Sequence, residues 1–261
     1  MRALNIAATG MLAQELNVEV ISNNIANMNT TGYKRQRAEF QDLLYQNLER
    51  AGAASSDAGT VVTNGIQIGL GVRAGSVYRI MQQGNLQQTE NPYDLAVQGR
   101  GFFKIQMPDG SDAYTRAGSF QLSPTGQIVT PQGYTVSPGI TVPQDATSVS
   151  ISPTGQVQAL LPGQNNAQTL GQLELSSFFN EAGLESLGDN QFKETAASGA
   201  PTTGLPGSTG FGTLAQGFLE TSNVNAVSEI TNLITAQRAY EMNSKVITAA
   251  DDMLQATNNL R

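Results

Sequence analysis

Carboxylates are the main side chains in this sequence that could carry catalysis, because its 261 residues include no histidine and no cysteine. The absence of both excludes Ser-His-Asp catalysis, thiolate nucleophiles, disulfides and zinc sites built on cysteine. A glycan hydrolase would need two acids about 5–9 Å apart in a cleft. No spacing in the sequence favours a particular pair, so this activity is only an alternative. Its candidate residues are Asp94, Asp109, Asp112 and Glu174.

Three short segments could hold an ion or a ligand, and each has a simpler structural interpretation. Asp109 and Asp112 begin like a calcium loop, but the other ligand positions are missing, so we expect a hairpin turn. The glycine-rich segment 69–75 lacks the spacing of a nucleotide loop, and no amphipathic helix follows it. The basic cluster at 34–37 is expected to make local ion pairs, because the net charge is −7. We therefore expect no metal, no cofactor and no nucleic-acid partner.

Both ends of the chain carry a heptad pattern of apolar residues, which predicts two α-helices that pair like a coiled coil. The first helix is expected to end before Gly32, and the second to begin near Asn223 to Asn225, since asparagine is a good N-cap. Small or polar residues between the repeating large apolar positions, which form the seam of the helix pair, would allow the two helices to pack closely. The candidate assembly interface consists of Leu4, Met11, Val18, Ile21, Ile25, Leu233, Tyr240, Ile247 and Leu254.

The two predicted helices are apolar on most of their faces. Between residues 1 and 28 the charged side chains are Arg2, Glu15 and Glu19. A helix of this kind belongs inside a larger structure. Two helices alone bury too little apolar surface to offset the cost of ordering them. We therefore predict that they are loosely held in the single chain and become ordered against neighbouring copies. The alternative is that they pack on the chain's own central region.

The middle of the chain has a strand period of two, which predicts a mainly antiparallel β domain and an α+β fold overall. Residues 102–107 form a predicted strand, and a turn at 108–110 leads into the returning strand. The sequence Ser-Pro-Thr-Gly occurs at 123–126 and again at 152–155. It fits a type I turn, so we expect two similar hairpins.

Composition and pattern together predict three regions. Segments 1–32 and 222–261 form a terminal helical assembly domain, and 33–75 is an extended connecting arm. The central β-rich domain covers 76–221 and includes a return loop at 196–213. The first residues do not form the apolar core of a secretory signal, and no apolar run is long enough to span a membrane.

Six motifs follow one another along nearly the whole chain: NNIANMNTTGYKR at 23–35, DLAVQGRGFF at 94–103, YTRAGSF at 114–120, GQIVT at 126–130, ETSNVN at 220–225 and QRAYE at 237–241. In this order they resemble the signature motifs of bacterial flagellar rod and hook axial proteins. Segments 40–46 and 65–72 are most similar to those of distal rod subunits, and the chain leaves no room for the added outer domain of hook proteins.

This resemblance implies a structural subunit and not an enzyme. The terminal helices would form an inner tube with the β domain outside, and the subunits would polymerise into a hollow helical drive shaft, the distal rod, that transmits motor torque to the hook. Expected partners are further copies of the chain, proximal rod proteins, the hook protein, the peptidoglycan-ring and outer-membrane-ring proteins, and the flagellar type III export apparatus. The expected location is the periplasm-spanning part of the basal body, reached without a cleavable signal peptide and without membrane insertion. Another axial subunit, such as a proximal rod or short hook protein, is the alternative.

Overall fold

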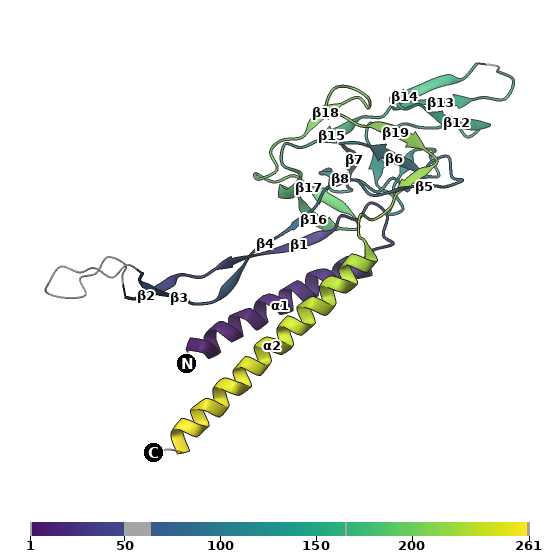
Figure 1. Cartoon of the computed structure of the whole chain (residues 1–261). Coiled ribbons are helices and arrows are strands. Elements are labelled where there is room, and N and C mark those ends of the chain that lie inside the picture. The colour runs from purple at the N-terminus through teal and green to yellow at the C-terminus, as the bar shows by residue number, and fades with distance from the viewer. Residues whose placement is uncertain (1, 50–63, 165, 260–261) are drawn as a thin grey trace. The chain divides into compact units, whose positions relative to one another are not determined.

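The chain divides into two compact units, each with its own secondary structure. The computed structural model describes residues 2–49, 64–164 and 166–259, except for the side chain of Glu49 (Figure 1). Unit 1 comprises 1–25, 36–78 and 225–261, and unit 2 comprises 26–35 and 79–224. The part of the expected connecting arm at 50–63 lies outside the described residues. The α+β fold, with terminal helices and a central antiparallel β region, is confirmed.

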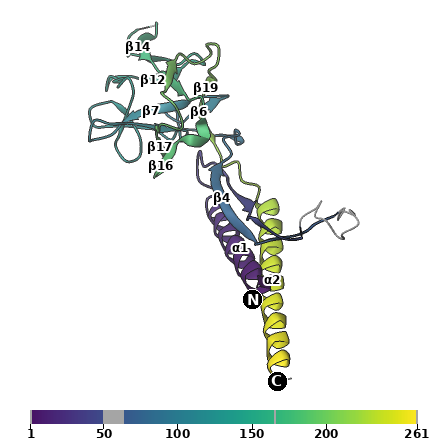
Figure 2. The same cartoon turned by 90° about the vertical axis from the view of Figure 1, so that its left-hand side faces the viewer.

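Unit 1 contains two long helices and a β ribbon. The helices lie side by side and run in opposite directions (Figures 1 and 2). Strands β1 and β4 pair with each other, as do β2 and β3. The elements are α1 (Arg2–Ala26), β1 (Gln36–Asp42), β2 (Tyr45–Glu49), β3 (Ile66–Gly69), β4 (Val72–Arg79) and α2 (Ala226–Asn259).

The ends of the two helices follow from local chemistry. Asn225 caps α2, because its Oδ1 accepts a hydrogen bond of 3.1 Å from the backbone N–H of Ser228. This confirms the predicted helix start. Helix α1 ends at Ala26 and is followed by turns up to Gly32, whose φ of +69° is the left-handed conformation expected of a glycine there.

Unit 2 is built of short strands, and every pairing whose register is described is antiparallel. A nine-stranded sheet has β7 near its centre, bonded to β8, β11 and β15. The strands are β5 (Leu86–Gln88), β6 (Leu95–Gln98), β7 (Phe102–Gln106), β8 (Asp112–Thr115), β9 (Gln121–Leu122), β10 (Ile128–Val129), β11 (Thr135–Val136), β12 (Ser148–Ile151), β13 (Gln156–Leu160), β14 (Gln168–Gln172), β15 (Leu175–Ser177), β16 (Glu185–Gly188), β17 (Gln191–Lys193), β18 (Thr202–Gly204), β19 (Thr213–Gln216) and β20 (Phe218–Glu220).

The predicted turns of the β region are present. Strands β7 and β8 form the expected hairpin, and Asp109 accepts hydrogen bonds from the N–H and hydroxyl of Ser111 in its turn. In both Ser-Pro-Thr-Gly segments the glycine N–H donates to the serine carbonyl three residues earlier, at 2.8 Å for Gly126 and 2.9 Å for Gly155. The β-turn prediction for the repeat is therefore confirmed.

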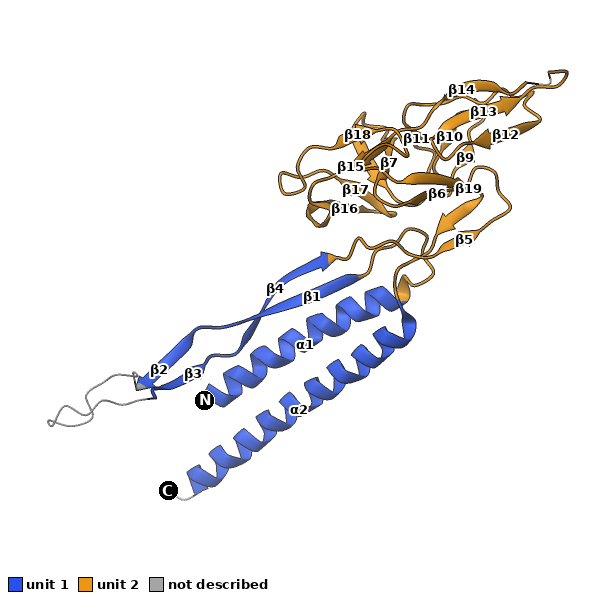
Figure 3. Ribbon diagram, turned by 45° about the horizontal axis from the view of Figure 1, so that its top comes forward, with its two compact units in different colours: residues 1–25, 36–78, 225–261 blue, residues 26–35, 79–224 orange. Residues whose placement is uncertain are grey.

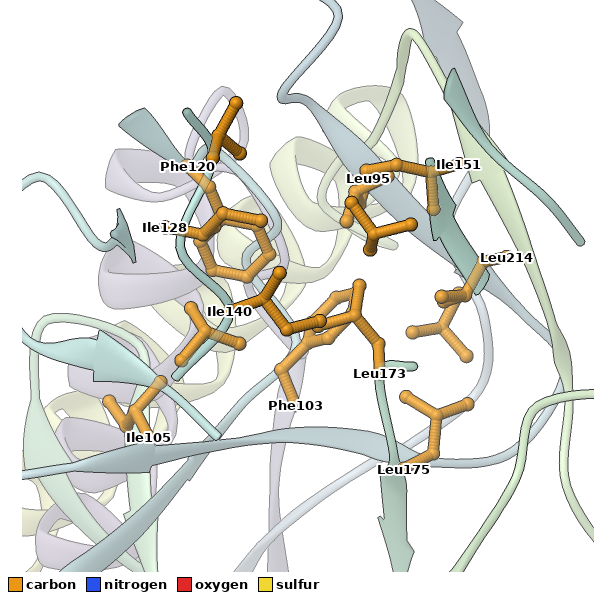
Figure 4. Packing of buried hydrophobic residues seen from close by; sticks show 14 of the residues in the cluster. Leu95, Phe103, Ile105, Phe120, Ile128, Ile140, Ile151, Leu173, Leu175 and Leu214 are labelled. Carbon is orange, nitrogen blue, oxygen red and sulfur yellow. The ribbon is translucent and has the colours of Figure 1, made fainter. Parts of the chain in front are cut away.

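Large apolar side chains fill the interior of unit 2 (Figure 4). The main cluster contains Phe103, Ile105, Phe120 and Leu173, all at most 1% exposed. In it Phe103 and Phe120 meet edge to face, with ring centroids 5.0 Å apart. A second cluster joins Phe102, Tyr114, Phe178, Leu184 and Phe192. These contacts hold the sheet and its loops as one body.

Candidate assembly surface and the buried motif cluster

Helices α1 and α2 are in contact over two heptads in a defined antiparallel register. Asn24 donates a hydrogen bond of 3.2 Å to the Glu229 carboxylate, and Gly10 lies against the side chain of Asn243. These two pairs are fourteen residues apart in both helices, so the helices stay in step. The same register places Arg2 level with residue 251, and the last part of α2 therefore extends past the beginning of α1.

Small side chains form the tightly packed part of the helix pair. Ala7, Ala236 and Ala250 are buried, at 4%, 2% and 7% exposed. A Cβ atom on Gly10 would come within 2.9 Å of the Asn243 amide nitrogen. The helices therefore approach through small residues, as the heptad pattern indicated, while larger residues lie beside this line.

Helix α1 has a second buried face that sequence reasoning missed. Asn24 donates to the backbone carbonyl of Gln36 and accepts from its N–H, both at 2.8 Å. Thr9 lies against Gly71 at the start of β4. Ala13 and Val20 are buried between these positions in the sequence. The spacing of residues 9, 13, 20 and 24 is a helical stripe that the heptad analysis overlooked.

The nine predicted interface residues differ in how far the single chain covers them. Ile21 is buried, whereas Tyr240 and Leu254 are each 44% exposed. Val18 and Tyr240 come together in one groove, and Leu254 lies in the part of α2 that extends past α1. The others are half-buried: Leu4, Met11, Val18, Ile25, Leu233 and Ile247.

Further large apolar side chains are exposed outside the predicted seam. Leu12 on α1 is 66% exposed, and Val227 at the start of α2 is 75% exposed. Exposed apolar side chains in such numbers on two adjacent helices are typical of a site of protein association. The other exposed examples on the two helices are Ile6, Ile230, Ile234, Met242, Val246 and Met253.

A buried ionic cluster in unit 2 joins several of the signature motifs noted in the sequence. Glu220 is fully buried, and its Oε1 accepts hydrogen bonds from Lys34 at 2.6 Å and from the Gly84 N–H at 2.9 Å. Its Oε2 accepts from Arg116 Nε at 2.7 Å. Lys34 comes from the first motif, Arg116 from the third and Glu220 from the fifth. The local ion pairing expected of the basic cluster is thus confirmed for Lys34.

The second motif supplies carbonyl acceptors for the same cluster. The Arg116 guanidinium donates to the carbonyl oxygens of Gly101 at 2.5 Å, Val97 at 3.2 Å and Gly99. Gly99 and Gly101 have φ angles of +107° and +133°, which only glycine adopts readily. These glycines bend the chain so that its carbonyls point at the cation, which explains the Gly-Arg-Gly sequence there.

Charge balance keeps this cluster ionised. Burial alone would raise the pKa of Glu220, but the nearby Arg116 and Lys34 charges together hold it below its usual value. Burial lowers the pKa of Lys34, and the Glu220 carboxylate opposes that shift. A buried carboxylate with two cations and a backbone N–H is fully hydrogen-bonded, so the cluster orders the segments that it joins.

Asn223 ties the chain segment before α2 to two others in unit 2. Its Oδ1 accepts from the Arg35 N–H at 2.7 Å, and its Nδ2 donates to the carbonyls of Ile80 and Gln82, each at 2.9 Å. The Gly32 N–H donates to the Glu220 carbonyl at 2.8 Å. The chain entering and the chain leaving the helices are therefore locked together within unit 2.

Three of the four candidate catalytic acids make local hydrogen bonds or an ion pair. Asp94 accepts a hydrogen bond from Asn91 at 2.9 Å, and Asp112 pairs with Lys104 at 2.8 Å. Hydrogen bonds from Ser111 hold the pKa of Asp109 below its usual value, and Glu174 is exposed. Across the described ranges, no group of three acids could hold a metal ion. Within the same residues, neither helix has the sustained apolar stretch that crossing a bilayer requires.

Comparison with known families and proteins covers nearly the whole chain. The family described as "Flagella basal body rod protein" matches residues 4–34, "Flagellar hook protein FlgE/F/G D1 domain" matches 96–159 and "Flagellar basal body rod FlgEFG protein C-terminal" matches 215–260. The chain is 64% identical over 261 residues to the flagellar basal-body rod protein FlgG of Caulobacter vibrioides, covering 100% of both. Proteins of the same name from Agrobacterium fabrum and Buchnera aphidicola are 54% and 48% identical, over 97% and 99% of each chain.

Proposed function

The chain belongs to the flagellar basal-body rod protein family, and we propose that this structural subunit of the distal rod polymerises through its terminal helices. The family resemblance indicated by the sequence motifs is confirmed, and the location is the flagellar basal body. The polymer is a hollow helical shaft that transmits motor torque to the hook. The role is structural and not catalytic.

The observation that carries this proposal is that the two helices bury small side chains between them and leave large apolar side chains exposed. Their seam buries alanines, while large side chains such as Leu12, Met242 and Met253 are 61–66% exposed. Burying each of these side chains contributes about 1.5–3 kcal/mol. Neighbouring copies supply the missing cover, and many such contacts per subunit give a shaft that resists twisting.

The contact between copies is head to tail. A heterologous contact that does not close into a ring produces an open helical polymer. In this arrangement the terminal segments 1–32 and 222–261 form the inner tube, 33–75 connects, and 76–221 forms the outer domain. Uncharged amides and hydroxyls, which are abundant in this chain, are less costly to bury between copies than charges.

The partners follow from a position in the distal rod. The polymer adjoins proximal rod proteins at one end and the hook protein at the other. It passes through the peptidoglycan and outer-membrane rings. Each chain reaches this position through the flagellar type III export apparatus. The absence of thiols suits a chain that is exported and folds at its destination.

Two substitutions that each introduce a charge test the proposal. Val18→Asp and Ile247→Asp each place a carboxylate at a half-buried seam position, one on each helix. We expect both variants to lose polymer formation in electron micrographs and sedimentation, while the near-ultraviolet spectrum of the β region is unchanged. Leu187→Asp, at an exposed apolar residue of unit 2, is the matched control and should polymerise normally. Filaments of normal length from either helix variant would contradict the proposal.

A further inference from the structure

The two Ser-Pro-Thr-Gly turns belong to a larger structural repeat within unit 2. In both turns, at 123–126 and at 152–155, the N–H of the glutamine after the glycine donates to the serine hydroxyl at 3.1 Å. The glycine carbonyl accepts from a third segment, from the N–H of Val142 at 2.7 Å in the first repeat and of Leu173 at 2.8 Å in the second. Equivalent positions of the two repeats can therefore be compared directly.

The second repeat is covered by the chain's own strand β19. Leu214 of this strand donates its N–H to the carbonyl of Pro153 at 3.0 Å. The side chain of Ile151, just before the turn, lies in the same apolar cluster as Leu214 and is 5% exposed (Figure 4). The cover of this repeat is thus an extended segment that contributes one large apolar side chain.

The first repeat lacks such a cover. Leu122 takes the position of Ile151 but is 38% exposed. In the part of the chain that the structure describes, no backbone N–H donates to the carbonyl of Pro124, the counterpart of Pro153. A pocket of about 180 Å³ lies beside Leu122, and a cavity of about 150 Å³ is large enough to hold benzene. The pocket lining is uncharged and also includes Tyr93, Val142, Pro143 and Ala146.

Phe179 has the properties of the missing cover. It is 98% exposed, more than any other large apolar side chain among the described residues. It follows β15, and the next residue, Asn180, has extended backbone with φ of −121° and ψ of 91°. Phe179 therefore presents a phenyl ring on an extended segment, as Leu214 presents its side chain on β19.

Phe179 and the pocket lie at opposite ends of the nine-stranded sheet (Figure 3). Strand β9, which contains Leu122, is at one end of the hydrogen-bonded strand order, and β16, the strand that follows Phe179, is at the other. Because Phe179 is exposed in the single chain, it does not fill the pocket of its own chain. A second copy can supply the ring, since the family forms a polymer of identical copies.

We propose that Phe179 of one copy inserts into the pocket beside Leu122 of the next copy, as Leu214 covers the second repeat within one chain. The ring packs on Leu122, Tyr93 and Pro124. This rests on the proposed function, because polymerisation brings the copies together, and it adds a contact between the β domains of successive copies. Ring and pocket are different surfaces, so the contact is heterologous and continues from copy to copy without closing.

Engineered thiols test the contact, because the chain has no cysteine of its own. Phe179→Cys and Leu122→Cys are made as separate variants, mixed in equal amounts, polymerised above the threshold concentration of either one and treated with a short bismaleimide. We expect a covalent dimer with one chain of each variant, identified by mass spectrometry of the joined peptides, and none below the polymerisation threshold. The matched control pairs Leu122→Cys with Leu187→Cys, at an exposed apolar residue of β16, and should give no mixed dimer.

Removal of the ring tests what it contributes. Phe179→Ala should raise the protein concentration needed for polymerisation by at least about tenfold, because aromatic side chains buried in an interface dominate its binding energy. Phe179→Leu keeps a large apolar side chain and should stay within about threefold of the wild type. Leu187→Ala removes a comparable exposed side chain and should leave the threshold unchanged.

Two results would overturn the inference and leave the proposed function standing. One is a polymer of the mixed cysteine variants that gives no mixed dimer, or no more than the Leu187→Cys control. The other is a Phe179→Ala chain that polymerises at the wild-type concentration. A wild-type chain that never polymerises would contradict the proposed function, and this inference with it.

Discussion

The two units of this chain differ in which side chains they bury and which they leave exposed. Unit 2 buries its largest residues, with Phe102, Phe103, Tyr114 and Phe120 all at most 2% exposed. In the helices of unit 1, which is blue in Figure 3, four of the eight buried residues are alanines, while large side chains such as Leu12, Met242 and Met253 are exposed. Phe179, at 98% exposed, is the clearest exception in unit 2.

This difference separates folding from assembly. A β body whose aromatic rings are already packed gains little from a neighbour, so it can be complete in a single copy. A helix pair held by a narrow line of alanines has most of its apolar surface still to bury. The β body of unit 2 is therefore already packed, and in the proposed polymer the exposed apolar side chains of the helices supply the favourable burial.

Amide hydrogen exchange in the monomer should show the largest contrast. We expect α1 and α2 to exchange at least about a hundredfold faster than β7, β8 and β11, since that ratio corresponds to a difference of about 3 kcal/mol in opening free energy. Exchange followed by mass spectrometry at a concentration below polymerisation measures it. Equal and strong protection of both helices in a proven monomer would break the comparison.

The ionic cluster of unit 2 should be the next most sensitive feature. Glu220→Gln leaves Lys34 and Arg116 buried beside a neutral amide, so unit 2 should lose about 3–5 kcal/mol of unfolding free energy. Urea denaturation followed by tyrosine fluorescence measures the loss. The matched control is Glu181→Gln, which removes the exposed pair with Arg100 and should cost less than about 1 kcal/mol. Equal losses in the two variants would argue against the cluster.

The buried Glu220 carboxylate should also make the stability of unit 2 depend on pH. The pKa of Glu220 is lower in the folded chain than in the unfolded chain, where it is about 4.3. Its stabilising contribution is therefore complete above the unfolded value and is lost as the pH falls through the folded value. The urea midpoint of the wild type should fall more steeply between pH 6 and pH 3 than that of Glu220→Gln. Parallel curves would mean that Glu220 is not the titrating group.

Widening the helix seam should have a moderate effect. Gly10→Leu favours an isolated helix, yet its side chain would collide with Asn243 and force the helices apart, at a cost of about 1–3 kcal/mol. The thermal midpoint of the helical signal at 222 nm measures this. Ala3→Leu changes an exposed position of the same helix and should not lower the midpoint. If Gly10→Leu raises the midpoint, the close approach of the two helices is wrong.

Removing the helix cap should have the smallest effect. Asn225→Ala leaves the Ser228 N–H without its side-chain acceptor, so the stability of α2 should fall by about 1 kcal/mol. The unfolding free energy from the same helical signal measures it. Asn225→Asp keeps an oxygen acceptor and should retain most of the stability. An equal loss in both variants would indicate that the cap contributes through another contact.

Much of the fold could be predicted because local patterns carry it. The heptads of Leu4 to Ile25 and Leu233 to Leu254 predicted both helices, and the cap at Asn225 marked where the second one begins. The hairpin of β7 and β8 and the two Ser-Pro-Thr-Gly turns also followed from a few neighbouring residues. In each case the determining interactions are short in sequence.

The ionic cluster could not be predicted from those patterns. Lys34 and Glu220 are 186 residues apart, and nothing near either one indicates the other. The sequence did contain a partial signal, since Arg116 and Glu220 are each the one charged residue of their motifs, YTRAGSF and ETSNVN. That arrangement points to a buried charge but leaves its partner open.

The sequence alone was enough to predict the two heptad helices, the antiparallel β region between them and the resemblance of the motifs to a polymer-forming family. Helical and strand periods depend on neighbouring residues, which is why they can be read directly. The folded chain was needed to show that Arg116 and Lys34 share one carboxylate, that α1 packs through Asn24 on β1, and that Asn243 lies over Gly10. Those choices depend on which distant segments can meet so that their buried polar groups find hydrogen-bond partners, and such contacts join residues far apart in the sequence.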